Sequence, residues 1–563
     1  MALQFDDERQ DRKLRELRVE EEEELARILA DRYKMKYVDL TGISIDTDAL
    51  RLLDEEAARA SNVAVFDAVG KKIQVAIQSP SQEEAMARLR NLEERGYIVI
   101  PFVVSKKSLD YAWDRYKDLS YSVESKAGTL DVSNDAIRKI MEAIKSVEDV
   151  KKVVAETMAL KKSFRVSRVV EIIVAGAIAT KASDIHVEPE DEYVRLRYRL
   201  DGVLVDVLLF DKETYFLLLS RIKLLSGVKL NVRTAAQDGR FSIVIDQKEI
   251  EVRMSTLPGA YAESIVMRLL DPSSLSIGLE TLGMEPRLLE IMRREIQKPN
   301  GLILNTGPTG SGKTTTLYAF LNQTKGSDNK VITIEDPIEY HLDGIVQTQV
   351  DPKKGYTFES GLRASLRQDP DIIMVGEIRD KPTAETAIQA SLTGHLVYST
   401  LHTNNAAGTY PRLIDLGVDP KILNDSINVV MAQRLVRILC SHCRVQIPMD
   451  PRFVPVCTTI LDEIRKLAPE MEFPTLPTTM WKEVGCPHCN GLGFKGRIAI
   501  FEIIMKDKNL EAVLRTNASA REIREATRGQ GVLTMVQDGV LKALRGTTTL
   551  EELERVVEIL PES

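Results

Sequence analysis

Residues 307–314 combine glycines, a lysine and a threonine at a spacing suited to binding phosphate. The segment is GPTGSGKT and fits the pattern GxxxxGK[ST]. Glycines let the backbone curl so that its N–H groups point at phosphate oxygens, and a helix that follows presents its positive end to the same anion. In this motif the lysine reaches the β- and γ-phosphates and the hydroxyl is a ligand of Mg²⁺. We therefore expect ATP and Mg²⁺ here, with Thr314 at the metal, and with contacts from Gly307, Pro308, Thr309, Gly310, Ser311, Gly312, Lys313, Thr314 and Thr315.

Acidic residues end two strand-like segments further along the chain. VITIED (331–336) ends in Glu335 and Asp336, and DIIMVGE (371–377) ends in Glu377. Parallel sheets bind ligands at the carboxyl ends of their strands, so these acids should face the phosphates. Hydrolysis requires such carboxylates to organise metal and water.

Two histidines, His395 and His402, flank the strand-like segment LVYST. One of them is expected to approach the γ-phosphate and to respond to its loss. The alternative is that both are structural hydrogen-bonding groups, which is the more common role of a single buried histidine.

Four cysteines form two CxxC pairs, separated by 42 residues: Cys440, Cys443, Cys486 and Cys489. Paired thiolates at this spacing suit tetrahedral Zn²⁺ in a closed structural site. The alternative is four reduced thiols without metal. Cys457 stands alone and is not expected to be a ligand.

Composition limits the classes of protein that this chain can belong to. It has 563 residues, more than one hydrophobic core normally serves, so about three or four domains are expected. The net charge of -8 argues against non-specific electrostatic binding to the phosphate backbone of nucleic acid. The longest apolar stretch, 169–179, is interrupted by Glu171 and is short of the roughly 20 residues that span a bilayer. With no apolar signal core at the N-terminus, we expect a cytoplasmic protein that meets membranes only through a partner.

The elements that must position these residues alternate between strand and helix. The strand-like segments 301–307, 331–336 and 371–377 are continuous apolar runs, each followed by a helical pattern. This order predicts a parallel sheet covered by helices on both faces. Before it, YVRLRYRL (193–200) alternates apolar residues with arginines, which places Arg195, Arg197 and Arg199 on one face of a strand.

The predicted order of domains follows from these patterns. In the N-terminal part, segments 71–78 and 97–104 are expected to be strands and 83–96 a helix. The predicted domains are a charged N-terminal arm (1–34), a small α/β domain (35–118), a linker with helices (119–165), an α+β subdomain (166–278) and an α/β phosphate-binding domain (279–563), which includes a tetracysteine subdomain (434–500) and a C-terminal helical region (505–563).

Several of these segments, taken in order, resemble one known family. It is that of the hexameric P-loop ATPases that drive type IV pilus assembly and type II secretion. The resemblance is strong over about 165–510 and loose over about 35–115. The segments similar to the family's Walker A, aspartate, Walker B and histidine boxes are GPTGSGKTTT (307–316), ITIEDPIEY (332–340), LRQDPDIIMVGEIRD (366–380) and TGHLVYSTLHTN (393–404). Those similar to the subdomain that precedes them are ASDIHVEP (182–189), RYRLDG (197–202) and QDGR (237–240).

The resemblance implies an architecture and a partner. It implies a RecA-like parallel-sheet ATPase domain, preceded by a PAS-like α+β subdomain and a small N-terminal α/β domain. Such ATPases are homohexamers that hold ATP between the two main domains of each subunit, near arginines of a neighbouring subunit. They turn an inner-membrane platform protein, which adds pilin subunits to a filament. The resemblance therefore implies a protein peripheral to the inner membrane, without direct contact to nucleic acid and without membrane insertion.

The resemblance also implies roles for single residues. Glu377 is expected to handle the attacking water and Glu335 to lie on the metal side, and the reverse assignment is the alternative. Asp336, which ends the same strand-like segment as Glu335, is expected from that position to contact the nucleotide. Arg199 and Arg221 are expected to act on the γ-phosphate. The arginines expected at interface or nucleotide contacts are Arg363, Arg367 and Arg379.

Two further features indicate which subfamily of these ATPases the chain resembles, but they do not distinguish between pilus assembly, type II secretion and DNA uptake. The tetracysteine site before GFKGRIAIFE (493–502) resembles that of assembly and secretion motors, which retraction motors generally lack. The repeat RLGxxLV, which in some assembly motors binds a cyclic dinucleotide, is not found, so that regulation is not expected. Type IV pili, type II secretion and DNA-uptake pseudopili remain equally compatible. The alternatives of other classes are a nucleic-acid translocase or helicase with the same core, and a binding module gated by nucleotide.

Overall fold

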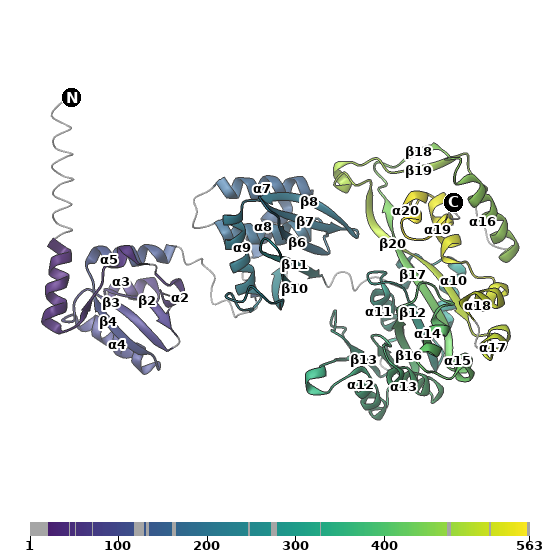
Figure 1. Ribbon diagram of the computed structural model, residues 1–563, viewed down its shortest axis with the longest axis horizontal. Coiled ribbons are helices and arrows are strands. Elements are labelled where there is room, and N and C mark those ends of the chain that lie inside the picture. The colour runs from purple at the N-terminus through teal and green to yellow at the C-terminus, as the bar shows by residue number, and fades with distance from the viewer. Residues whose placement is uncertain are drawn as a thin grey trace. The chain divides into compact units, whose positions relative to one another are not determined.

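The chain forms two compact units, one of residues 1–126 with 156–169 and one of 127–155 with 170–563 (Figure 1). The residues that the computed structural model describes are 21–43, 45–50, 52–69, 71–117, 129–130, 134–159, 165–245, 248–271, 278–326, 328–469, 474–516 and 519–559.

The first unit is built around a four-stranded sheet with the order β1-β4-β3-β2. Strand β2 runs antiparallel to β3, and the other pairs are parallel. The strands are β1 (Lys36–Tyr37), β2 (Val63–Val69), β3 (Lys72–Ile77) and β4 (Ile98–Val103). Its helices are residues 21–33, α2 (Thr47–Leu50), α3 (Glu55–Ala60), α4 (Glu83–Glu94) and α5 (Lys106–Asp114). The strands and the helix predicted at 71–78, 97–104 and 83–96 are thus present, and a core that includes Ile73, Leu89 and Trp113 joins them.

The second unit begins with a seven-stranded sheet in the order β5-β9-β10-β11-β6-β7-β8. Its strands are β5 (Thr129–Leu130), β6 (Asp184–Pro189), β7 (Val194–Leu200), β8 (Val203–Phe210), β9 (Gln237–Ile245), β10 (Lys248–Pro258) and β11 (Glu263–Leu270). The helices of this region are α6 (Asn134–Ala143), α7 (Val147–Ala159), α8 (Arg165–Ala179) and α9 (Lys212–Leu225). The alternation predicted in β7 is confirmed, because Val194, Leu196, Tyr198 and Leu200 are buried while the three arginines between them are half-buried.

A second seven-stranded sheet, in the order β14-β13-β15-β16-β12-β17-β20, lies at the centre of the C-terminal region. Its strands are β12 (Gly301–Thr306), β13 (Val331–Glu335), β14 (Val346–Gln349), β15 (Ile372–Val375), β16 (Leu396–Leu401), β17 (Ile427–Leu439) and β20 (Phe494–Met505). The expected parallel pairing is confirmed from β14 to β17, but β20 runs antiparallel to β17. The prediction rested on the segments 301–307, 331–336 and 371–377 and did not include β17 and β20, which the tetracysteine segment connects.

Helices surround this sheet. They are α10 (Pro286–Glu295), α11 (Lys313–Thr324), α12 (Phe358–Ser365), α13 (Lys381–Leu392), α14 (Thr409–Asp415), α15 (Pro420–Ser426), α16 (Val454–Leu467), α17 (Lys508–Leu514), α18 (Ala520–Thr527), α19 (Met535–Leu544) and α20 (Leu550–Glu554), and two short strands, β18 (Val445–Pro448) and β19 (Thr479–Lys482), pair with each other.

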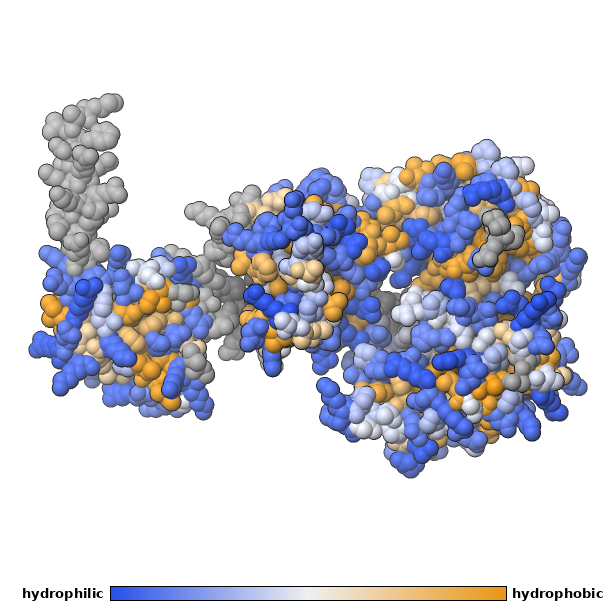
Figure 2. All heavy atoms as spheres, in the orientation of Figure 1, coloured by the Kyte–Doolittle hydropathy of each residue, from blue (hydrophilic) through white to orange (hydrophobic). Residues whose placement is uncertain are grey.

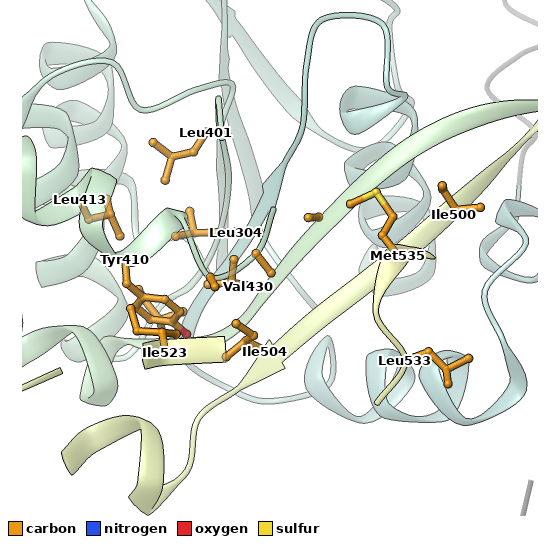
Figure 3. Packing of buried hydrophobic residues seen from close by; sticks show 14 of the residues in the cluster. Leu304, Leu401, Tyr410, Leu413, Val430, Ile500, Ile504, Ile523, Leu533 and Met535 are labelled. Atoms are coloured by element: carbon orange, nitrogen blue, oxygen red, sulfur yellow. The ribbon is translucent and has the colours of Figure 1, made fainter. Parts of the chain in front are cut away.

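The central strands are apolar along their whole length because both faces of the sheet are buried in hydrophobic clusters. Every residue of β12 is buried. Leu302 and Leu304 belong to one hydrophobic cluster, and Ile303, which points to the other face, belongs to another. Figure 3 shows part of the first cluster, in which Leu304 and Val430 of two strands lie near Tyr410 of α14. Helices therefore cover both faces, as the sequence predicts.

Within the part of the chain that is described, no helix combines the length and the apolar character that crossing a bilayer requires. On the face seen in Figure 2, hydrophilic residues predominate and hydrophobic residues form small groups between them.

Candidate nucleotide site and metal centre

The loop between β12 and α11 has a backbone that only glycine adopts easily. Gly307, Gly310 and Gly312 have φ angles of 147°, 78° and 89°. A Cβ atom on Gly307 would lie 2.5 Å from the carbonyl oxygen of Gln433 on the neighbouring strand β17. The loop is therefore curled and closely supported, and α11 begins with Lys313 directly behind it. The ammonium of Lys313 donates to the carbonyl oxygens of Gly307 and Pro308, at 2.8 and 3.1 Å.

A cavity of about 580 Å³ lies over this loop, within the range of about 300–1,000 Å³ usual for small-molecule sites. The loop and the start of α11 form its base, through Thr309, Gly310, Gly312, Lys313, Thr314 and Thr315. Its acidic residues are Glu335, Asp336, Glu339 and Glu377, and besides Lys313 its basic ones are Arg268, Arg379, His402 and Arg497. A curled glycine loop, a helix N-terminus, a lysine and several carboxylates in one cavity fit Mg²⁺ and a nucleoside triphosphate.

Glu335 is held in a fixed position at the end of β13. Glu335 is only 3% exposed. Its carboxylate accepts hydrogen bonds from three side chains. Tyr318 of α11 donates to one oxygen. The hydroxyl of Thr333 (2.6 Å) and the amide of Gln347 (3.1 Å) donate to the other. A buried carboxylate needs such donors, and here they fix its orientation toward the cavity.

Glu377 lies at the end of the neighbouring strand β15 and belongs to a charged network. Its carboxylate pairs with Arg379 and lies 3.1 Å from Nε2 of His402. Arg379 also lies 3.6 Å from the carboxylate of Asp336. Burial lowers the pKa of Lys313, and the nearby negative charge of Glu377 opposes that shift. Both residues line the cavity.

The four cysteines converge, with all four sulfur atoms within 4.8 Å of one another. Sγ–Sγ distances are 3.9 Å for Cys440 and Cys486, 3.8 Å for Cys443 and Cys489, and 3.7 Å for Cys486 and Cys489. A tetrahedral zinc with Zn–S bonds of about 2.3 Å requires separations of about 3.8 Å. Burial acts to raise the pKa of Cys489, but the N–H groups of Cys486 and Gly493 donate to its sulfur, and the pKa falls to about 7. The donor set fits structural Zn²⁺.

Comparisons with known proteins agree with this geometry. Residues 159–555 match the model of the family described as Type II/IV secretion system protein, and residues 33–122 match the MshEN domain. The chain belongs to the type II/IV secretion system protein family. It is 38% identical over 505 residues to the type II secretion system protein E of Klebsiella pneumoniae, covering 89% of this chain and 96% of that one. It is 36% identical over 536 residues to the type IV pilus assembly ATPase PilB of Myxococcus xanthus (strain DK1622), covering 95% and 91%.

Solved structures show the same fold. The Yersinia pseudotuberculosis ATPase DotB aligns with a TM-score of 0.51 at 20% identity, over 70% of this chain and 94% of that one. The expected RecA-like architecture is therefore confirmed, and the membership of this ATP-binding family makes the chain a P-loop ATPase.

Most of the residues expected at the nucleotide site of this P-loop ATPase lie around the cavity over the phosphate loop. Asp336, Arg379 and His402 line it together with Glu335 and Glu377. Gly307, Pro308 and Ser311 belong to the curled loop that forms its base, although they are not among the lining residues.

Other predicted residues lie elsewhere. His395 is at the amino end of β16, the opposite end of the strand from the cavity, and its Nδ1 lies 3.1 Å from the carbonyl oxygen of Ala390. Arg199 on β7 and Arg221 on α9 are not among the cavity's lining residues. Arg363 pairs with Glu359 of its own helix α12. Arg367 donates to the carbonyl oxygen of Arg363.

Sequence patterns did not single out the residues that support the site. Gln433 on β17 donates to the carbonyl oxygen of Ser311 (2.6 Å) and accepts from the amide of Asn305 (2.8 Å). Tyr318 and Gln347 hold Glu335, and Arg268 lines the cavity from β11. Gln433 is more than 120 positions from the loop that it supports, and Tyr318 and Gln347, although closer in the sequence, lie outside the segments that match a known motif.

Proposed function

We propose that this chain is the ATP-hydrolysing motor that assembles a type IV pilus or the pseudopilus of type II secretion. One observation carries the proposal: the glycine loop and two strand-end carboxylates, Glu335 and Glu377, meet in a single cavity. The similarity along nearly the whole chain to a type II secretion protein E and to a pilus assembly ATPase supports the filament as its product.

The chemistry assigned to the site follows from its side chains. Lys313 would bind the β- and γ-phosphates, and Thr314 would be a ligand of Mg²⁺. We assign the attacking water to Glu377, which lines the cavity together with Lys313 and is paired with His402. Glu335, held by three donors, would stabilise the metal and its water ligands. When bound, Mg²⁺ neutralises charge on the transferring phosphoryl group.

We further propose that the motor is a homohexamer that acts on an inner-membrane platform protein from the cytoplasmic side. In that assembly Arg199 and Arg221 would serve the nucleotide of a neighbouring subunit, and Arg363 and Arg367 would lie at interfaces. The tetracysteine site would hold a structural Zn²⁺.

The test is Mg²⁺-dependent release of phosphate from ATP by the purified chain. Lys313→Ala and Glu377→Gln should each lower kcat by about 100-fold or more, because each removes a charge needed in the transition state. Matched controls are Lys325→Ala, at the far end of α11, and Glu385→Gln, an exposed acid of α13, which should leave the rate unchanged. Undiminished hydrolysis by both site variants would overturn the proposal.

A further inference from the structure

Asp184 on β6 is a nearly buried carboxylate with an arginine on each side. It is directly opposite Arg199 of β7 and directly opposite Arg268 of β11. Its side chain is 6% exposed. A buried carboxylate is unfavourable unless it is paired and hydrogen-bonded, so this position is maintained by its two neighbours and in turn restrains them.

The contacts of Asp184 divide its two oxygens between the arginines. Oδ1 accepts from Nε of Arg268 at 3.0 Å. Oδ2 lies 3.4 Å from Nε of Arg199 and accepts from the hydroxyl of Ser183 at 2.8 Å. The backbone of Ser183 also fixes both partners, because its N–H donates to the carbonyl of Arg199 and its carbonyl accepts from the N–H of Leu269, the residue after Arg268.

The two arginines are held in different ways. Arg199 also donates to the carbonyl oxygen of Gly202 and lies 3.3 Å from Nε2 of His186. Burial, and then the charge of Arg199, lower the pKa of His186, so the ring is neutral at pH 7 and its Nε2 can accept. Arg268 has no second hydrogen-bond or ion-pair partner among the residues that the structure describes. Its side chain is 60% exposed and lines the nucleotide cavity together with Ser183.

Anchoring at Nε has a specific consequence for a side chain as long as arginine. The bond fixes the guanidinium plane, and the two terminal nitrogens are left to donate at the cavity. Without the anchor, Arg268 would be a flexible surface side chain that must be ordered again each time a nucleotide binds.

We propose that Asp184 is a positioning residue of the ATPase site, which orients Arg268 toward the bound nucleotide. This inference rests on the proposed function and adds a residue to it. Asp184 does not touch the nucleotide in this scheme. It acts through Arg268.

The experiment is a double-mutant cycle on the full-length chain, with kcat and KM for ATP measured for Asp184→Asn, Arg268→Ala and the double variant. Each single variant should lower kcat/KM about tenfold, the size expected for losing one charge-assisted hydrogen bond. In the Arg268→Ala background, Asp184→Asn should cost nothing more. A merely structural role would lower the melting temperature but leave kcat/KM of the folded protein unchanged.

The matched control is Glu188→Gln. Glu188 lies on the same strand and the same face as Asp184 and accepts from Nε of Arg197 at 2.8 Å, but neither residue lines the cavity. Its kcat/KM should equal that of the wild type. If Asp184→Asn does not fold, Ser183→Ala serves instead, because it removes one donor to Asp184 without removing charge, and its smaller loss should also vanish in the Arg268→Ala background.

The outcomes separate the two proposals. Additive losses of kcat/KM in the cycle, or an equal loss of kcat/KM in Glu188→Gln, overturn the positioning role of Asp184. Neither result contradicts the proposed motor function. A wild-type chain that releases no phosphate from ATP with Mg²⁺ overturns the motor itself.

Discussion

At the scale of single residues, the site depends on side chains that hold other side chains. Glu335 shows this most directly, because its three donors come from α11, β13 and β14. The donor from α11, Tyr318, connects the acid to the helix that begins at the phosphate loop. A displacement of that helix therefore reaches the carboxylate through one hydrogen bond.

Tyr318→Phe should lower kcat by about tenfold while ATP still binds, because it removes a single donor to a charged group without changing the packing. The measurement is steady-state hydrolysis at saturating ATP, together with ATP affinity at equilibrium. The matched control is Tyr398→Phe, a fully buried tyrosine on β16 that packs against Phe320 and does not contact Glu335. A wild-type kcat in Tyr318→Phe would show that the hydroxyl does not position the acid.

At this scale, the sequence could predict the site residues that lie within one short segment or directly after a recognisable strand. The phosphate loop lies in one segment of eight residues, and Glu335, Asp336 and Glu377 each follow a recognisable strand. The placement of His402 against Glu377, and of His395 away from the cavity, depends on which end of β16 each residue occupies. Both histidines flank that strand in the sequence, and its parallel pairing with β12 and β15 in the structure places His402, not His395, at the edge where the carboxyl ends of the strands meet.

At the scale of elements, β17 determines the shape of the phosphate loop. Its Gln433 bonds to the loop through the side chain and closely approaches Gly307 through the backbone. Sequence patterns identified β12 from its continuous apolar run and α11 from the helical pattern that follows the phosphate loop. They did not identify the support from β17, since that contact joins residues more than 120 positions apart. The reversed direction of β20 was missed for a similar reason, because nothing local in a strand encodes the orientation of its partner.

Gly307→Ala should weaken ATP binding by at least tenfold and destabilise the chain by about 2 kcal/mol. Both effects follow from a φ of 147°, which non-glycine residues avoid, and from a Cβ placed 2.5 Å from the carbonyl oxygen of Gln433. Thermal unfolding and nucleotide titration measure the two effects. Gly326→Ala, beyond the other end of α11 where a Cβ would meet nothing within 4 Å, should change neither. Normal ATP affinity in Gly307→Ala would mean that the loop tolerates another conformation.

At the scale of the whole molecule, the chain divides into two compact units, each with a hydrophobic core of its own. The first unit has a hydrophobic cluster of its own, which includes Leu40, Val75 and Trp113. The second unit contains the nucleotide cavity and the cysteines, and two clusters on opposite faces of its central sheet. The small α/β domain was predictable from alternating strand and helix signals, but its match to the MshEN domain was not, because the short repeat sought there is absent.

The cysteine cluster joins parts of the second unit that lie far apart in the sequence. It lies where β17 ends and β20 begins. Just beyond it, Arg444 packs over the ring of Trp481 and donates to the carbonyl oxygen of Gly546, after α19. The N–H of Leu439 donates to the carbonyl oxygen of Thr547. Zinc would therefore fix the end of the long strand pair and, through these contacts, the C-terminal helices.

Removal of zinc should consequently lower the melting temperature of the chain by on the order of 5–10 °C, since a structural metal contributes directly to folding free energy. The measurement combines elemental analysis, expected to find about one zinc per chain, with thermal unfolding before and after treatment with a strong chelator. Cys443→Ser should reproduce the chelated state. Cys457→Ser is the matched control, because Cys457 is buried in α16 and lies outside the cluster, so this variant should retain its zinc. Protein that is purified without chelator, is folded, contains no zinc and has four freely titratable thiols would refute the metal site. The strand pair would then be held by its own ladder together with the contacts of Arg444 and Leu439.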